Sequence, residues 1–439
     1  MKKGFVALLL ILAIVVLVSP AIVGRIAEES MHENLDWAAR ESGEVSVTTE
    51  SFARGWFSSE GRHRFELQDG DLLVAAQTLI GPLDADALPV LVVDTKLDHG
   101  LIPVSSMSRE RGSLAPGLGS AISRMSVEFP DGRVVELPGT IYSEVGLAGE
   151  LHSHYELESG SYQDGGTAAT WGATNINIKT NPKSGEAVFD GVIGSFSIGD
   201  TAETMALDQL AFKGQQQPTK FGVAVGEVAL EMTGLLVGVG GADAAGVKSL
   251  SVNASTELAG DDINAEATVS AVMRELPQFG EMVFDIAVTV AGADAEALGR
   301  AQQALESVGA SQNPMTVFGP AEQDLKQLFA AGFEINLERL DVTLPQGTVS
   351  ARMLFTFGEE DLATFDWTTL LLSTEASIDL SIPDPIVQML VQAEPNIAMA
   401  IGGGYLVKHG DAYELEALLK KGLLTVNGAP IPIPLGAVR

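Results

Sequence analysis

The chain has 439 residues, no cysteine, and 26 basic against 58 acidic side chains, which gives a formal net charge of -32 at pH 7. This composition excludes disulfides, thiolate metal sites and a cysteine nucleophile, and it argues against nucleic acid as a partner, because a phosphate polyanion binds basic surfaces. Hydrophobic residues make up 46% of the chain, so it is expected to bury a core.

The N-terminal segment predicts the compartment. Residues 5–18 are all apolar, with Lys2 and Lys3 before them and no further charge until Arg25. Crossing a bilayer core takes about 20 helical residues. Residues 1–24 are therefore expected to form a signal-anchor helix whose N-terminal lysines stay in the cytoplasm.

This anchor predicts a single-pass protein of the inner membrane, which it contacts through residues 5–23, with the bulk of the chain in the periplasm. Two alternatives remain: a cleaved signal peptide, for which Ser19, Pro20 and Ala21 offer a cleavage site, and a buried core helix. The apolar run resumes at Ile22, after that site, and it is long for a signal peptide, which favours the anchor.

The acidic excess of the exported part has two interpretations. Anionic lipid headgroups repel such a surface, so the bulk of the chain is not expected to lie flat on a membrane. A salty environment, which screens the charge, is the simpler explanation, and a cationic or divalent-ion partner is the functional one.

Periodicity divides the rest of the chain into three regions. Residues 25–43 have apolar side chains near a 3.6-residue period, which predicts a helical stem. Residues 44–214 alternate polar and apolar side chains, which predicts a β-rich region. After a polar loop at 215–220, residues 221–439 are predicted to form a second β-rich region.

Two helices are expected within this second region. An Ala-, Glu- and Gln-rich sequence predicts one near residues 293–308, and Pro320 is expected to open another at 321–331. Residues 335–342 and 349–357 predict a hairpin of matched strand lengths. The predicted fold class is α+β, predominantly antiparallel β-sheet, with one N-terminal transmembrane helix.

The C-terminal segment is ambiguous between helix and strand. Residues 414–421 suit a helix by composition, yet apolar side chains alternate with other residues across 413–419. Gly422 and the pair Asn427-Gly428 are turn residues, since both residue types tolerate positive φ. Two strands and two turns are therefore predicted.

Three stretches form a pattern that spans nearly the whole chain. They are Arg54-Gly55-Trp56-Phe57-Ser58-Ser59, then Asp98-His99-Gly100, and a tail that contains Gly404-Tyr405, Gly422 and Asn427-Gly428. In order and spacing they resemble the YdgA-like family of bacterial envelope proteins, a family of undefined function. Leu101 stands where the family has a proline after His-Gly. The resemblance implies an inner-membrane anchor and an exported β-rich body, and it implies no catalytic residues.

The residues themselves suggest structural roles for these motifs. Gly55 allows a sharp backbone turn, which is expected to place the rings of Trp56 and Phe57 in a core. Asn427 and Gly428 are expected to form a tight hairpin turn.

One pair of histidines suggests a metal site. On a strand, residues i and i+2 point to the same face, so His152 and His154 could bind one metal with Glu150 or Glu156 as a further ligand. Two exposed histidines on a polar strand face are the simpler interpretation, and no cofactor is predicted. The chain contains no Gly-x-Ser-x-Gly element, so no catalytic residue is assigned.

Apolar strand faces between Phe221 and Met273 carry the functional hypothesis. An open apolar sheet face could hold acyl chains, whereas the two predicted helices could cover it as an ordinary core, and the available helices favour the second interpretation. The expected role is a non-enzymatic scaffold, or a factor in envelope assembly or lipid handling, with a lipid or an envelope protein as partner. A periplasmic hydrolase with an unrecognised site is the alternative.

Overall fold

The structure is a computed structural model that describes most of the chain from residue 45 onward. The described residues are 45–55, 57–68, 90–99, 118–128, 130, 132–164, 167–181, 183–199, 203–239, 242–276, 280–308 and 314–432. The predicted anchor (1–24) and stem (25–43) lie outside them, as do Trp56 and Gly100. None of the helices that the structure describes is long and apolar enough to cross a membrane.

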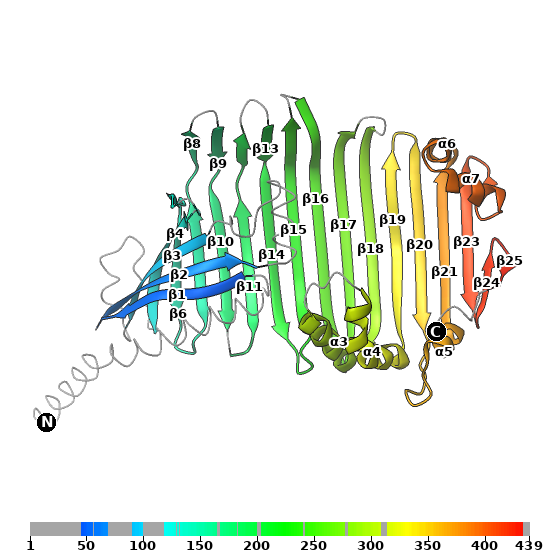
Figure 1. Cartoon of the computed structure of the whole chain (residues 1–439), viewed down its shortest axis with the longest axis horizontal. Helices are drawn as coiled ribbons and strands as arrows, with labels where there is room; N and C mark the ends of the chain where they lie inside the picture. Colours follow the sequence, from blue (N-terminus) through cyan, green and yellow to red (C-terminus); the bar gives the residue numbers. More distant parts are fainter. Residues whose placement is uncertain are drawn as a thin grey trace, which may run out of the picture. The chain divides into compact units, whose positions relative to one another are not determined.

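The chain divides into two compact units, which we call unit 1 and unit 2. Unit 1 comprises Met1–Gly160 and Trp171–Gly194, and unit 2 comprises Ser161–Thr170 and Ser195–Arg439. Both consist mainly of antiparallel strands, so the predicted antiparallel β-rich fold is confirmed (Figure 1).

Unit 1 is a single antiparallel succession of strands. It contains β1 (Val45–Arg54), β2 (Ser58–Leu67), β3 (Val90–His99), β4 (Gly119–Glu128), β5 (Val134–Glu136), β6 (Thr140–Val145), β7 (Leu151–Leu157), β10 (Thr174–Asn181) and β11 (Glu186–Ile193). Hydrogen-bonded neighbours follow the order β1-β2-β3-β4-β6-β7-β10-β11, and β5 pairs with part of β4. Its core forms where apolar side chains on one face meet, and the members are Leu97, Leu118, Ala121 and Val145, with Leu151 packed against them.

Unit 2 contains the long strands. Its strands are β8 (Gly160–Asp164), β9 (Thr167–Trp171), β12 (Phe196–Gly199), β13 (Glu203–Leu207), β14 (Gln209–Pro218), β15 (Ala224–Val239), β16 (Ala242–Ala259), β17 (Asp262–Leu276), β18 (Gly280–Asp294), β19 (Phe333–Leu344), β20 (Gly347–Phe357), β21 (Thr374–Pro383), β22 (Val407–His409), β23 (Ala412–Lys420), β24 (Leu423–Val426) and β25 (Ala429–Ile431). From β14 to β21 each strand pairs with the next, and β21 then pairs with β23. Figure 1 shows these long strands side by side.

Five helices connect strands of unit 2 within the described residues. They are α3 (Ala295–Val308), α4 (Pro314–Ala331), α5 (Trp367–Ser373), α6 (Asp384–Ala393) and α7 (Pro395–Gly402). The helix predicted to open at Pro320 begins earlier, at Pro314, which suits a first turn because proline lacks the N–H that would be unpaired there. The expected hairpin at β19 and β20 and the two C-terminal strands, β23 and β24, are confirmed.

The loop predicted at 215–220 is mostly strand. Gln215 to Pro218 form the end of β14 and pair with Ala224 to Glu227 of β15, and the turn itself begins at Thr219. Three consecutive glutamines read as a polar loop in the sequence, yet their side chains suit a strand that ends in solvent. The division between the two units falls near Gly194 rather than at this turn.

Candidate functional site

Two of the sequence motifs meet in unit 1. Ser59 lies near the start of β2 and His99 ends β3, and antiparallel pairing brings these ends together. The Ser59 Oγ lies 3.2 Å from His99 Nε2, and the His99 backbone N–H donates to the carbonyl of Phe57 at 3.0 Å. Both side chains are 1% exposed. Residues 40 positions apart therefore form one buried contact.

Gly55 makes the turn that precedes Ser59. Its N–H donates to the carbonyl oxygen of Ser58 at 2.8 Å, and a Cβ on Gly55 would lie only 2.7 Å from that oxygen. The expectation that Phe57 enters a core is wrong, because its side chain is 48% exposed. Phe57 lies in the turn between β1 and β2, directly before the first residue of β2. Arg54 ends β1 beside this turn.

Gly119 lies next to the contact between Ser59 and His99, where it was not predicted. It pairs with His99 in the β3–β4 register, and a Cβ on Gly119 would lie 2.7 Å from the carbonyl oxygen of Asp98. Only glycine allows the two strands to approach this closely. The sequence contained the glycine, but only the strand register shows what it faces.

The Ser59–His99 pair raises the question of nucleophilic catalysis. A serine nucleophile needs a histidine base, a group that orients the histidine, and access for a substrate. Asp98 precedes His99 on the same strand, so its side chain projects from the opposite face and is not placed to orient the ring. Since Ser59 and His99 are both buried, the contact is best explained as a hydrogen bond that fixes the ends of β2 and β3.

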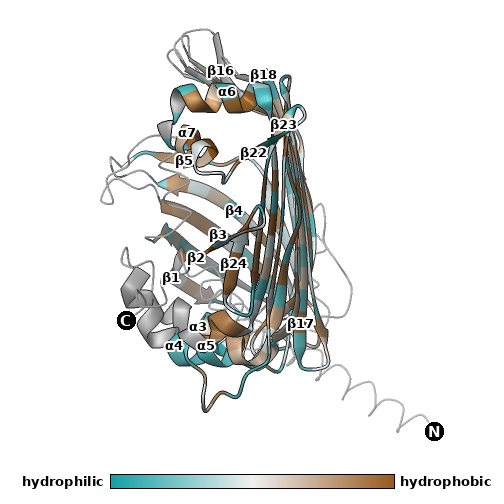
Figure 2. Ribbon diagram, turned by 90° about the vertical axis from the view of Figure 1, so that its right-hand side faces the viewer, coloured by the Kyte–Doolittle hydropathy of each residue, from teal (hydrophilic) through white to brown (hydrophobic). Residues whose placement is uncertain are grey.

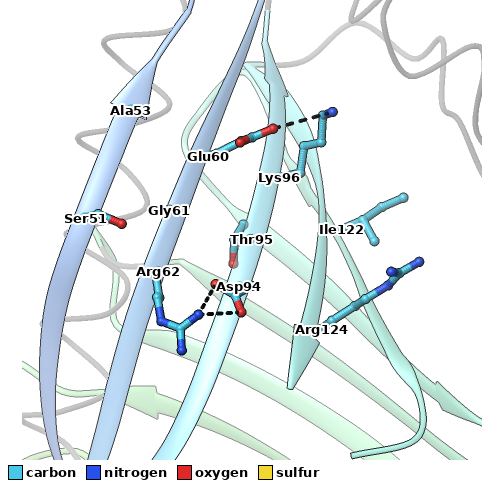
Figure 3. Close-up of a pocket in the computed structure, with 10 residues that line it drawn as sticks. All are labelled: Ser51, Ala53, Glu60, Gly61, Arg62, Asp94, Thr95, Lys96, Ile122 and Arg124. Carbon is cyan, nitrogen blue, oxygen red and sulfur yellow. Dashed lines mark hydrogen bonds and ion pairs between the residues drawn. The ribbon is translucent and has the colours of Figure 1, made fainter. Parts of the chain in front are cut away.

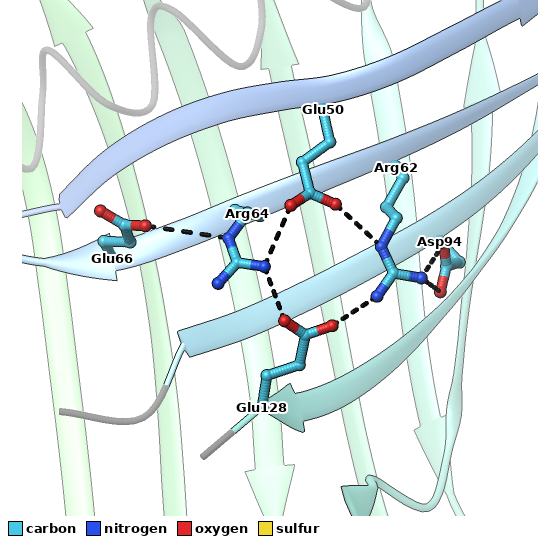
Figure 4. A network of polar contacts seen from close by, with 6 residues as sticks. All are labelled: Glu50, Arg62, Arg64, Glu66, Asp94 and Glu128. Atoms are coloured by element: carbon cyan, nitrogen blue, oxygen red, sulfur yellow. Dashed lines mark hydrogen bonds and ion pairs between the residues drawn. The ribbon is translucent and has the colours of Figure 1, made fainter. Parts of the chain in front are cut away.

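The opposite face of β2 carries a network of charged side chains. Arg62 Nη1 donates to both carboxylate oxygens of Asp94, at 3.3 and 3.2 Å (Figure 3). Arg62 also donates to Glu50 at 3.0 Å and to Glu128 at 2.5 Å. Arg64 donates to the same two glutamates, at 3.0 and 2.6 Å (Figure 4). The network therefore joins β1, β2, β3 and β4.

Hydrogen bonding within this network changes the titration of Glu128. The hydrogen bond from Arg64 is the largest influence and lowers the pKa of the Glu128 carboxyl, and the bond from Arg62 acts in the same direction. The carboxylate form is favoured because it accepts both bonds.

The candidate metal ligands lie on β7. His154 Nδ1 donates to the carboxamide oxygen of Asn177 at 2.7 Å, and the Asn177 amide donates to Asp190 at 2.8 Å. His152 is exposed on the same face. Within the described part of the chain, no three His, Asp or Glu side chains are grouped as metal ligands. His154 therefore takes part in a polar chain across β7, β10 and β11.

The tail motif forms two tight turns near the C-terminus of unit 2. Gly422 has a φ of 72° in the turn between β23 and β24, and Asn427 and Gly428 have φ values of 48° and 77° in the turn before β25, as predicted for tight turns. The Asn427 amide donates to the carbonyls of Gly404 and Tyr405, at 2.9 and 3.1 Å. The two halves of the tail motif are thus joined directly.

Unit 2 presents an apolar face, defined by two adjacent rows of side chains that cross its strands. The first row, in register from β14 to β23, is Phe212, Leu230, Val252, Val269, Ile286, Leu340, Ala351, Leu380 and Leu415. The second, from β15 to β23, is Val228, Ala254, Ala267, Val288, Leu337, Met353, Ile378 and Ala417. Neither row contains a polar side chain.

The other face of the same strands is polar. The row next to the first apolar row, from β15 to β23, is Glu231, Ser251, Ser270, Asp285, Asp341, Ser350, Ser381 and Glu414. Because side chains alternate along a strand, the register keeps every apolar row on one face and every polar row on the other. Unit 2 is therefore amphipathic across the eight strands from β15 to β23.

The helices that the structure describes cover the ends of the apolar face. In Figure 2 the groups α3–α5 and α6–α7 lie on the same side of the sheet, near opposite ends of the strands. The helices α3 and α4 pack with Val223 and Ile263, and α6 and α7 pack with Leu380 and Leu415. The middle of the first row, from Val252 to Leu340, is half-buried and belongs to neither cluster. Among the described helices, the cover favoured by the sequence is thus found at the ends of the face.

Comparison with known proteins identifies a family and no individual relative. No curated protein matches the chain, and no solved structure matches it. The model of a family described as bacterial protein of unknown function, DUF945, matches residues 1–434. The chain therefore belongs to the DUF945 family of bacterial proteins.

Proposed function

We propose that this protein is a non-enzymatic lipid-handling protein of the bacterial envelope, and that the apolar face of unit 2 binds acyl chains. The observation that carries the proposal is the pair of apolar rows in continuous register across unit 2, against which the described helices pack at the ends. Side chains such as Val269 and Ile286 remain partly accessible between the two helix groups.

The chemistry of the face selects an alkyl ligand. Its two rows offer no hydrogen-bond donor or acceptor from a side chain, so a polar ligand would lose its bonds to water without replacement. Each methylene that an acyl chain buries contributes about 0.8 kcal/mol. Nine strands at a spacing of about 4.8 Å make a row about 40 Å long, which exceeds the bilayer's hydrocarbon thickness of about 30 Å. The face is therefore long enough for an acyl chain lying across the strands.

The N-terminal sequence supports an envelope location. The uncharged run of residues 4–24, preceded by Lys2 and Lys3, has the length and flanking charge of an inner-membrane anchor. The resemblance to YdgA-like envelope proteins points the same way. An anchored chain with its bulk in the periplasm would work beside a supply of phospholipid, which is the ligand that the apolar face suits.

Native mass spectrometry of the detergent-extracted full chain tests the proposal. We expect bound phospholipid on the wild-type protein and its loss in Val269→Asp, which places a carboxylate in the middle of the apolar face. The matched control is Thr268→Asp, which adds the same charge one residue away on the polar face. Absence of lipid from the wild type, or equal lipid in both variants, would contradict the proposal. A dimer without lipid would assign the face to a second copy instead.

A further inference from the structure

A pocket in unit 1 contains Arg124, which has no carboxylate partner among the residues that the structure describes. The pocket measures about 620 Å³ and lies on the charged face of β1 to β4 (Figure 3). Its polar side chains include Arg62, Asp94, Lys96 and Arg124, and Ile122 supplies an apolar contact. This volume lies in the range of small-molecule sites, so the pocket has room for more than a bare ion.

The strand register explains why no carboxylate of the described strands pairs with Arg124. Arg124 lies directly opposite Asp94 in the β3–β4 pairing. Both oxygens of Asp94 accept from Arg62, at 3.3 and 3.2 Å, and Figure 3 shows the Arg124 side chain directed away from Asp94. Among the residues that the structure describes, none forms a hydrogen bond or an ion pair with Arg124. In a chain with 58 acidic and 26 basic residues, an arginine is expected to find a carboxylate unless its position keeps it apart.

A second cation lies within reach of the same space. Lys96 is opposite Ile122, so it is the diagonal neighbour of Arg124. Diagonal pairs are separated by about 7–8 Å, a distance that long side chains can bridge through a shared ligand. Lys96 contacts Glu60 at 3.6 Å, and both of these side chains are more than half exposed. An ion pair between two exposed side chains is weak. The pocket lining has three cations and two carboxylates, and Arg124 is the cation in excess.

We propose that this pocket binds a phosphate group, with the guanidinium of Arg124 as the principal ligand and the ammonium of Lys96 as the second. A guanidinium offers parallel N–H donors that match two phosphate oxygens, and such charge-assisted pairs are stronger than neutral hydrogen bonds. The side chain of Ile122 lies between the two cations and gives an apolar surface to whatever carries the phosphate. The inference uses unit 1 alone and does not depend on acyl-chain binding by unit 2.

Calorimetry on the full chain tests this assignment with three soluble probes. These are inorganic phosphate, dihexanoyl phosphatidic acid and dihexanoyl phosphatidylcholine, the last two below their micellar concentrations. We expect phosphatidic acid to bind and Arg124→Ala to weaken its binding about tenfold or more, because hydrogen bonds to charged groups are the strong ones. Arg124→Lys keeps the positive charge but loses the paired N–H donors of the guanidinium, so its affinity should lie between those of the wild type and Arg124→Ala. The matched control is Arg339→Ala, which removes an exposed arginine from β19 of unit 2 and should leave binding unchanged.

The probes also identify the source of the phosphate. Equal binding of inorganic phosphate and phosphatidic acid, both dependent on Arg124, indicates a site for phosphate in general. Binding of phosphatidic acid alone indicates a lipid headgroup. Binding that survives in Arg124→Ala, equal binding of phosphatidylcholine, or no binding of any probe would overturn the proposal. Circular dichroism of Arg124→Ala confirms that any loss is not due to unfolding.

Discussion

Asn427 joins three segments of unit 2 through one side chain. Its φ of 48° lies in the left-handed region, its amide donates to Gly404 and Tyr405, and its side-chain oxygen accepts from the backbone N–H of Glu416 at 2.8 Å. We expect Asn427→Ala to lower the free energy of unfolding by about 2 kcal/mol, since it loses these bonds and strains the backbone. Asn427→Gly loses the same hydrogen bonds but does not strain the backbone, so it should lower the free energy of unfolding by less. Equal denaturation midpoints for the two variants would assign the whole effect to the hydrogen bonds.

The buried contact of Ser59 with His99 gives a second test at the residue scale. Ser59→Ala removes this hydrogen bond from a site that is 1% exposed, so we expect a loss of about 1–2 kcal/mol in urea denaturation. Ser58→Ala, on the other face of β2, is the control and should change stability by less than about 0.5 kcal/mol. If both variants have the same free energy of unfolding in urea, the contact does not fix the strand ends.

Residues whose role is local were predictable, and residues whose role depends on distant pairing were not. The Asn427-Gly428 turn follows from the φ preferences of two adjacent residues, and both residues have positive φ in the structure. Ser59 and His99 were selected as separate motifs, because only the β2–β3 register shows that they meet. Phe57 was misplaced because an aromatic side chain shortly after a glycine suggests a core, whereas here it lies exposed in the turn before β2.

At the scale of elements, the network of Arg62 and Arg64 holds four strands together and makes their stability depend on pH. The pKa of Glu128 is lowered from its ordinary value of 4.5, mainly by the hydrogen bond from Arg64. The associated stabilisation is therefore complete above about pH 4.5 and is lost as the pH falls through the lowered pKa.

Glu128→Gln tests this dependence. The variant should be less stable than the wild type at pH 7. The difference should begin to shrink below pH 4.5, where Glu128 of the unfolded chain takes up a proton, and should vanish below the lowered pKa, where the folded carboxyl is neutral as well. Thermal melts between pH 7 and pH 3 measure it. A constant difference across that range would show that Glu128 acts through packing and not through its charge.

Strand alternation made most elements predictable, and the errors have local causes. Gln215 to Pro218 read as a loop because polar runs with proline usually break structure, yet Pro218 is the last residue of β14, where its missing N–H is tolerated. The start of α4 was placed at Pro320, since two prolines, at 314 and 320, both suit a first turn and the sequence does not choose between them.

At the scale of the molecule, the sequence indicated the amphipathic sheet of unit 2 and left its cover undecided. Alternation over β15 to β18 predicts that one face is apolar. The positions of α3, α4, α6 and α7 at the two ends of the strands depend on where the chain leaves and re-enters the sheet, which periodicity does not encode. Whether the face is closed or partly open therefore required the structure.

Site-specific photocrosslinking tests the central claim, that acyl chains bind the apolar face, most directly. A benzophenone amino acid is introduced at Val269 or, as the matched control, at Ser270, the next residue on the polar face. After illumination of the full-length protein in phospholipid bilayers, we expect a lipid adduct at position 269 and little at position 270. Adducts of equal yield at both positions, or none at 269, would contradict the account.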